Sequence, residues 1–248
     1  MQKFMKALAA IMLMVVVLCA ACTKDPENGS GNNNGGNGSG GGGNANGHAY
    51  VDLGLPSGIL WAACNVGADT PEGYGDYFAW GETSLKDVYV WSTYKYANST
   101  SVYDPRLTKY CSKSSCGDNG FTDTLTILLP EDDAATANMG GDWRTPTYNE
   151  WDELIAYCTQ TWTTRNGVNG RLFSALNGNS LFLPAAGYRD VGSLDNVGYD
   201  GNYWSSSLST SYPEYAHFFY FVSEESYMNG CTRSGGQSVR AVLPASKN

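Results

Sequence analysis

The segment from residue 199 to residue 234 holds the residue types best suited to recognising another molecule. Its 36 positions include six Tyr, eight Ser, three Phe, two Asn and one Trp. Antibody paratopes use a similar mixture, because rigid rings supply contact area while small hydroxyl and amide groups supply adaptable hydrogen bonds. This composition predicts a ligand-binding face. The expected contact residues are Tyr199, Asn202, Tyr203, Tyr212, Tyr215, Phe218, Tyr220, Val222, Tyr227 and Asn229.

Side chains suited to catalysis or metal binding are sparse. The chain has two histidines, His48 and His217, far apart in sequence, which disfavours a histidine-based metal site. His217 lies among aromatic residues, where a structural histidine is favoured over a general base. No Gly-x-Ser-x-Gly nucleophile elbow occurs in the expected folded region. We therefore assign no catalytic residue, no metal and no cofactor, and we expect that the protein is not an enzyme.

The acidic run that follows Pro130 has two interpretations. Proline followed by carboxylates is typical of the first turn of a helix, where the dipole end is positive. The alternative is a calcium site that uses Asp132, Asp133 and Asn138. Calcium needs six to eight oxygens from converging segments. Three residues on one short helix do not supply them, so a helix start is the prediction.

The expected folded region holds an odd number of cysteines. They are Cys64, Cys111, Cys116, Cys158 and Cys231. An exported protein can form disulfides, but at least one of the five thiols must stay unpaired. The sequence does not fix the connectivity, and a Cys111–Cys158 disulfide is our hypothesis.

Charge limits the classes of partner. The chain has 248 residues, a net charge of −9 and 42% hydrophobic residues, enough to build one core. Nucleic-acid binding requires clustered Lys and Arg, so the acidic balance argues against such a partner.

The N-terminal residues predict export and anchoring. Lys3 and Lys6 precede an apolar run that ends in small residues before Cys22. This resembles the signal peptide of bacterial lipoproteins, which implies a lipid on Cys22; an ordinary secretory signal is the alternative. Residues 24–27 resemble a surface-export signal of lipoproteins from Bacteroides-like bacteria. We expect a signal peptide at 1–21, a flexible Gly/Asn-rich tether at 22–47 and one domain at 48–248. The mature protein is expected to be anchored in the outer membrane and to face outward. Only its lipid would contact the membrane.

The clearest secondary-structure signal is a helix after Thr147. Thr147 and Glu150 form a capping box, and Trp151, Leu154 and Ile155 start one apolar stripe. Two short apolar runs, 50–53 and 59–64, predict a hairpin. Residues 84–126 predict a long ordered loop, and the runs 180–183 and 215–222 each predict a strand. Helix in the first half and strands in the second indicate an α+β fold with an antiparallel sheet.

Several separate motifs, in order, resemble the Fibrobacter succinogenes major paralogous domain family, which is abundant in gut Bacteroides lipoproteins. The motifs are VDLGLPSG (51–58), WA (61–62), YGDYFAWGE (74–82), WRTPT (143–147), FLPAAGY (182–188), YWSS (203–206) and SVR (238–240). The resemblance implies a C-type-lectin-like fold in which the first and last strands pair and loops are displayed. Residues 144–151 are also similar to a motif of formylglycine-generating enzymes, which share the fold. Those enzymes need a pair of redox-active cysteines near the C-terminal end, where this chain has Cys231 alone.

Aligned to the family pattern, His217, Phe219 and Phe221 fall on the core face of their strand. Phe218, Tyr220 and Val222 then alternate onto the outer face, because a strand has period two. This outer face looks hypervariable in relatives that are targets of diversity-generating retroelements, so this chain could be such a target. In the alternative interpretation, Phe218 and Tyr220 pack under a loop.

These observations lead to one expected function and two alternatives. We expect a surface lipoprotein whose lectin-like head binds a glycan or a host or bacterial surface protein. The second class is a structural component of a fimbrial tip or surface layer. The third, ranked last, is an enzyme of the formylglycine-generating type.

Overall fold

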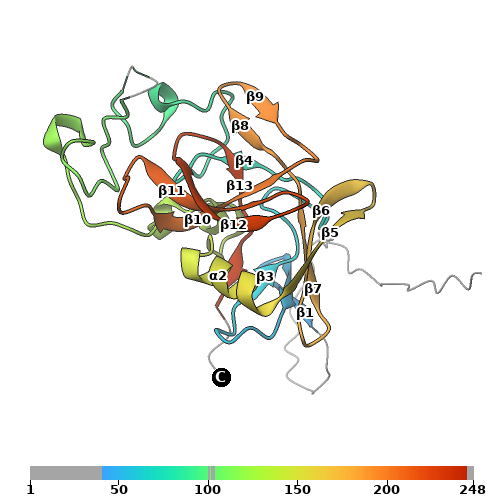
Figure 1. Ribbon diagram of the computed structural model, residues 1–248. Helices are drawn as coiled ribbons and strands as arrows, with labels where there is room; N and C mark the ends of the chain where they lie inside the picture. Colours follow the sequence, from blue (N-terminus) through green and yellow to red (C-terminus); the bar gives the residue numbers. More distant parts are fainter. Residues whose placement is uncertain (1–40, 100, 102–103, 245–248) are drawn as a thin grey trace, which may run out of the picture.

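The computed structural model describes residues 41–99, 101 and 104–244 (Figure 1). They form a mixed α+β fold that is mostly antiparallel sheet, as the sequence predicts. The sequence signals of the expected signal peptide, Cys22 and the start of the tether lie outside the described residues. Within the described part of the chain, no helix has both the length and the apolar character needed to cross a bilayer.

The first sheet has the strand order β1-β2-β3-β14. Its strands are β1 (Gly42–Ala45), β2 (His48–Asp52), β3 (Leu60–Ala62) and β14 (Val242–Leu243). The predicted hairpin is confirmed as β2 and β3. The expected pairing of the first and last strands is wrong: β1 occupies the outer edge of β2, so β14 pairs with the free edge of β3.

Strand β1 also lies inside the stretch for which a flexible tether was expected. Asn46 and Gly47 both have positive φ, 50° and 80°, which matches the two-residue turn that an Asn-Gly pair favours. The Asn46 side chain donates to the Met139 carbonyl. The expected domain boundary at residue 48 is therefore wrong, because β1 belongs to the first sheet.

The second sheet has the order β12-β11-β10-β13-β4 and carries most of the predicted contact residues. Its strands are β4 (Tyr77–Phe78), β10 (Gly201–Leu208), β11 (Tyr215–Phe221), β12 (Ser226–Thr232) and β13 (Gln237–Ser238). Neighbouring strands are antiparallel except β10 and β13, which are parallel. Strand β12 is at the edge and β10 is central.

Two smaller sheets complete the strands. The three-stranded sheet contains β5 (Thr159–Arg165), β6 (Val168–Ser174) and β7 (Ser180–Pro184), the last of which confirms the buried strand predicted at 180–183. A hairpin pairs β8 (Tyr188–Asp190) with β9 (Ser193–Asp195). Figure 1 shows this hairpin at one end of the molecule, beside β4 and β13.

Helix α2 (Tyr148–Tyr157) confirms the predicted helix and its capping box. The Glu150 amide donates to the Thr147 hydroxyl over 3.3 Å, and the Glu150 carboxylate accepts from the Thr147 amide over 2.8 Å. Trp151 is fully buried, stacks on Phe219 at a ring distance of 5.0 Å and donates to the Trp204 carbonyl. Helix α2 therefore supports one face of the second sheet.

The acidic run after Pro130 starts a helix later than predicted. A 3-10 turn, η3, spans Pro130–Asp132, and helix α1 spans Ala134–Met139. Asp133 is the N-cap, because its carboxylate accepts from the amides of Ala135 and Thr136 and so fixes the start of the helix.

The long loop between β4 and η3 has a defined path over its described residues. It contains the short 3-10 turns η1 (Trp91–Thr93) and η2 (Asp118–Gly120). Buried Asp132 accepts hydrogen bonds from the hydroxyls of Tyr96 and Tyr110. Buried Arg233 donates to the carbonyls of Tyr110 and Pro213 at 2.8 and 2.9 Å, and so ties the loop to the second sheet.

The core has two apolar clusters that meet at the second sheet. One contains Trp204, Phe218 and residues of the ordered loop. The other contains Phe219, Phe221 and the apolar side of α2. The middle of β11 is therefore covered on both faces, which decides where the predicted contact residues can lie.

Candidate functional site

Three predicted contact residues are buried. Asn202, Tyr203 and Phe218 are 5%, 0% and 6% exposed. Every position of central strand β10 is buried, and Phe218 packs against Trp204 with ring centroids 6.2 Å apart. Their burial contradicts the prediction that these three residues reach a ligand, and Phe218 belongs to a core cluster that also contains residues of the long loop.

The remaining contact residues do not form one surface. Tyr199 is 77% exposed and lies in the turn between β9 and β10. Tyr212 and Tyr215 are exposed, with ring centroids 6.0 Å apart and Lys113 Nζ 5.5 Å from the Tyr212 ring. Tyr215 and Tyr220 are five positions apart on β11, so their side chains leave opposite faces of the sheet. Val222 lies just beyond β11 and is half-buried.

Tyr220, Tyr227 and Asn229 are brought together on one face of β11 and β12, and we call these three residues the tyrosine face. Tyr220 lies opposite Tyr227, and Phe218 lies opposite Asn229. The Tyr220 and Tyr227 rings are 5.3 Å apart and tilted by 52°. Phe218 lies beneath them, 6.4 Å from the Tyr220 ring. Tyr227 is 41% exposed and Asn229 is also exposed.

The surroundings of the tyrosine face are acidic. Burial raises the pKa of the Tyr220 hydroxyl, and the negative charges of Asp200, Glu225 and Glu224 raise it further. The hydroxyl therefore stays protonated at neutral pH and can donate a hydrogen bond. Such a surface favours a neutral or cationic ligand and repels an anionic one.

Tyr188 on β8 belongs to the same neighbourhood and was not predicted. Burial is the main cause that raises the pKa of Tyr188, and the nearby charges of Asp195, Asp200 and Asp190 raise it further. Cys231, which shares a face of β12 with Asn229, also contributes to the raised pKa. The residue stands in the FLPAAGY motif, but only the tertiary fold brings β8 near β12. No local pattern in the sequence indicates that proximity.

The cysteines do not form the disulfide in our hypothesis. Cys111, Cys116, Cys158 and Cys231 all have free thiols. Cys111 and Cys158 belong to different core clusters, so the Cys111–Cys158 pairing is wrong. Burial raises the pKa of all four thiols, that of Cys158 to about 11, which keeps them protonated and weakly nucleophilic at neutral pH.

His217 and the acidic run at 131–133 have structural contacts. Burial lowers the pKa of His217, whose ring meets Tyr148 edge-on at 4.9 Å. Asp132 is bonded to tyrosine hydroxyls, and Asp133 accepts from the amide and hydroxyl of Thr145 as well as capping α1. These carboxylates are therefore saturated by protein donors. Over the described ranges, no group of three or more His, Cys, Asp or Glu residues is arranged to hold a metal ion.

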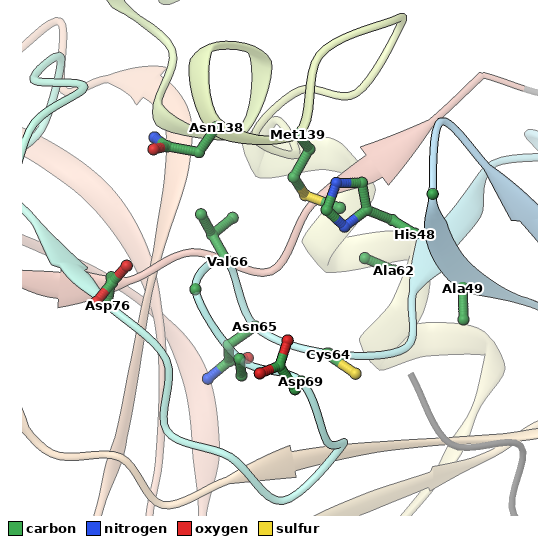
Figure 2. A pocket seen from close by; sticks show the side chains of 13 residues that line it. His48, Ala49, Ala62, Cys64, Asn65, Val66, Asp69, Asp76, Asn138 and Met139 are labelled. Carbon is green, nitrogen blue, oxygen red and sulfur yellow. The ribbon is translucent and has the colours of Figure 1, made fainter. Parts of the chain in front are cut away.

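A pocket of about 310 Å³ opens between the loop after β3, the end of α1 and the start of β2. Figure 2 shows Met139 and His48 close together and Asp76 on the far side. Its central polar residue, Asn65, donates to the Tyr74 carbonyl at 2.8 Å and accepts from the Arg240 Nε at 2.9 Å. Asn65 is thus fixed by the scaffold and not left for a ligand. No motif or periodicity in the sequence indicates this pocket.

Comparison with known proteins adds no relative from which a function could be transferred. No protein-family model, no curated protein and no solved structure matches this chain.

Proposed function

We propose that this protein is a lipoprotein of the outer cell surface whose lectin-like head binds a glycan or a surface protein through the tyrosine face. One observation carries the proposal: two tyrosine rings and an exposed amide share one face of a rigid sheet. Aromatic rings supply area and can stack on sugar rings, while the hydroxyls and the amide orient a ligand. No catalytic residue is part of this proposal.

Charge narrows the ligand class. The negative charges of Asp200, Glu224 and Glu225 act on the Tyr220 hydroxyl. A neutral glycan or a protein segment with basic residues suits this face, whereas nucleic acid does not. Burial raises the pKa of all four free thiols, which does not favour chemistry of the formylglycine-generating type, since that chemistry needs reactive thiols.

The anchor and the finer fold are parts of the same proposal. The proposed signal peptide, the lipid on Cys22 and the outward-facing outer-membrane location rest on the sequence, and β1 occupies part of the stretch expected to be a tether. Support for a C-type-lectin-like fold comes from β14, which lies in the same sheet as the N-terminal hairpin, and from the long ordered loop. Diversification of the face by a retroelement remains a hypothesis, tested by sequencing this region in sister isolates.

The test uses the full chain, solubilised in detergent, on arrays of glycans and of surface proteins. Tyr227→Ala removes an exposed ring, and we expect its binding to fall by about tenfold, since a stacked ring contributes about 1 kcal/mol or more. Tyr157→Ala is the matched control, because Tyr157 is 55% exposed at the end of α2, away from the face. Equal binding by the wild type and Tyr227→Ala would show that the ligand binds elsewhere.

A structural role in a surface polymer is the second candidate. Strand β12 is a seven-residue edge strand of the second sheet, and such edges can accept a further strand. Co-purification with a polymer, without any ligand on the arrays, would favour this candidate over the first.

A further inference from the structure

A second pocket lies on the other side of β8 from the tyrosine face. Its volume is about 350 Å³, within the range of small-ligand sites. The floor is formed by Tyr77 and Tyr89, and the walls by Leu85, Asp76, Asp87 and Arg189. Tyr188 and Arg189 are consecutive on β8, so one side chain joins the tyrosine neighbourhood and the other enters this pocket.

Arg189 is held in place by its backbone and by an aromatic ring. Its amide donates to the Gly236 carbonyl over 2.7 Å, and its carbonyl accepts from the Gly236 amide over 2.8 Å. The guanidinium carbon lies 5.4 Å from the centre of the Tyr77 ring. A Cβ at position 236 would come within 2.6 Å of the Tyr89 ring and 3.0 Å of the Arg189 Cβ, so only glycine permits this packing.

The guanidinium has no acidic partner. In the part of the chain that the structure describes, none of the ion pairs includes Arg189, and none of the side-chain hydrogen bonds uses its guanidinium donors. Lys86, the other cation of the pocket, is already paired with Glu82 at 2.9 Å. A half-buried guanidinium without a protein partner keeps its hydrogen-bond donors available for an anionic ligand.

Asp76 and Asp87 set the second requirement. Neither carboxylate accepts a hydrogen bond from a donor in the described ranges; Asp76 is half-buried and also lines the first pocket, and Asp87 is exposed. Carboxylates only accept hydrogen bonds when ionised, so a ligand here must bring donors as well as an anion. A ligand with a carboxylate alone would meet two negative charges.

We propose that this pocket binds a small carboxylate that carries hydrogen-bond donors next to its carboxyl group. The ligand carboxylate pairs with the planar guanidinium of Arg189 through two parallel hydrogen bonds. The donors, sugar hydroxyls in a uronic acid or an ammonium in an amino acid, satisfy Asp76 and Asp87. The pocket is separate from the tyrosine face, so this proposal does not depend on the proposed function.

The experiment is calorimetric titration of the full chain in detergent with four probes: glucuronate, glycine, methyl glucoside and acetate. Glucuronate or glycine is expected to bind at least about tenfold more tightly than the other two, because only they combine the anion with donors. The tighter of these two identifies the source of the donors. Equal binding of methyl glucoside, or no binding of glucuronate and glycine at millimolar concentration, overturns the proposal.

Variants locate the site. Arg189→Gln is expected to weaken binding by about tenfold or more, and Arg189→Lys to restore part of it, because an ammonium keeps the charge but not the planar fork. Arg106→Gln is the charge-matched control, since Arg106 is exposed and paired with Asp104. Unchanged binding by Arg189→Gln overturns the proposal.

A second pair of variants keeps the test valid if Arg189→Gln does not fold. Leu85 is 57% exposed on the pocket wall, so Leu85→Glu and Leu85→Lys should fold. We expect the first to weaken and the second to strengthen glucuronate or glycine binding several-fold, while Val88→Glu, three residues along and outside the lining, changes nothing. Identical affinities for both Leu85 variants overturn the proposal.

Discussion

Removing the Glu150 carboxylate is expected to destabilise the protein by about 3 kcal/mol. Arg144 donates to both carboxylate oxygens, over 2.7 and 2.6 Å, and the two side chains are 34% and 16% exposed. A bidentate pair at this depth lies between an exposed pair, at about 0.2 to 1 kcal/mol, and a buried one, at about 3 to 5 kcal/mol, so we assign it about 2 kcal/mol. Loss of the bond from the Thr147 amide adds about 1 kcal/mol.

Urea denaturation of the full chain in detergent measures the coupling energy between Arg144 and Glu150 through a double-mutant cycle. Glu150→Ala is expected to cost about 3 kcal/mol, Arg144→Ala about 2, and the double variant about 3, so that the coupling is about 2 kcal/mol. Asp152→Ala is the control, because it removes the same charge from an exposed position of α2 and should stay within about 0.5 kcal/mol of the wild type. A coupling below about 0.5 kcal/mol would show that the pair is no stronger than an exposed one.

The same carboxylate gives the pair a pH dependence. Burial alone would raise the pKa of Glu150, but hydrogen bonds from Arg144 and Thr147 outweigh it and lower the pKa. A glutamate with a lowered folded-state pKa stabilises the fold at pH values above its unfolded pKa of about 4.3. That stability is lost as the pH falls through the folded pKa. The difference between the wild type and Glu150→Ala should therefore be constant at neutral pH and shrink below about pH 4.

Two further predictions concern buried polar groups. Arg240→Met should lower the free energy of unfolding in urea by at least about 3 kcal/mol, because four oxygens bonded to the buried guanidinium would lose their donors. Arg106→Met, at an exposed arginine, is the control. A loss below about 1 kcal/mol for Arg240→Met would show that water replaces the lost donors. Alkali should unfold the protein between pH 10 and 12, since burial raises the pKa of Tyr77 and of Tyr94 to about 12. A raised phenol pKa stabilises the fold below the unfolded value of about 10 and loses that effect as pH rises, at about 1.4 kcal/mol per pH unit and phenol. Tyrosinate absorbance that rises without loss of circular dichroism would contradict this.

Local signals in the sequence were sufficient for the elements that depend on near neighbours. The capping box at Thr147 and Glu150 requires only residues three apart, and the structure has it as predicted. The β2–β3 hairpin and the aromatic strand β11 are of the same kind. Strand β1 differs from the expectation of a tether: Asn46-Gly47 favours a hairpin turn, but the glycine-rich composition around it is equally typical of a flexible linker.

Elements that depend on contacts distant in sequence were not predictable in this way. Arg240 bonds to Asn65 and to the Phe182 carbonyl, more than 50 positions away, and has no carboxylate partner that could signal its burial. Tyr188 and the pocket around Arg189 depend on β8 lying between the loop at Tyr89 and Gly236, which no periodicity records. The pairing of β14 with β3 depends on β1 occupying the other edge of the hairpin.

The contact residues show why strand parity alone cannot find a binding face. The alternation of side chains along β11 correctly places Phe219 and Phe221 on one face of the sheet and Phe218 and Tyr220 on the other. It assumes, however, that one side of the strand is solvent. Here the second side also packs into a core cluster, one that includes residues of the long loop, so that Phe218 is buried while Tyr220 is half-buried. Exposure on this sheet therefore depends on distance from the loop as much as on parity, and it increases toward edge strand β12. A diversified or ligand-selected surface on this scaffold should accordingly be sought at Tyr227 and Asn229, and not at Asn202 or Phe218.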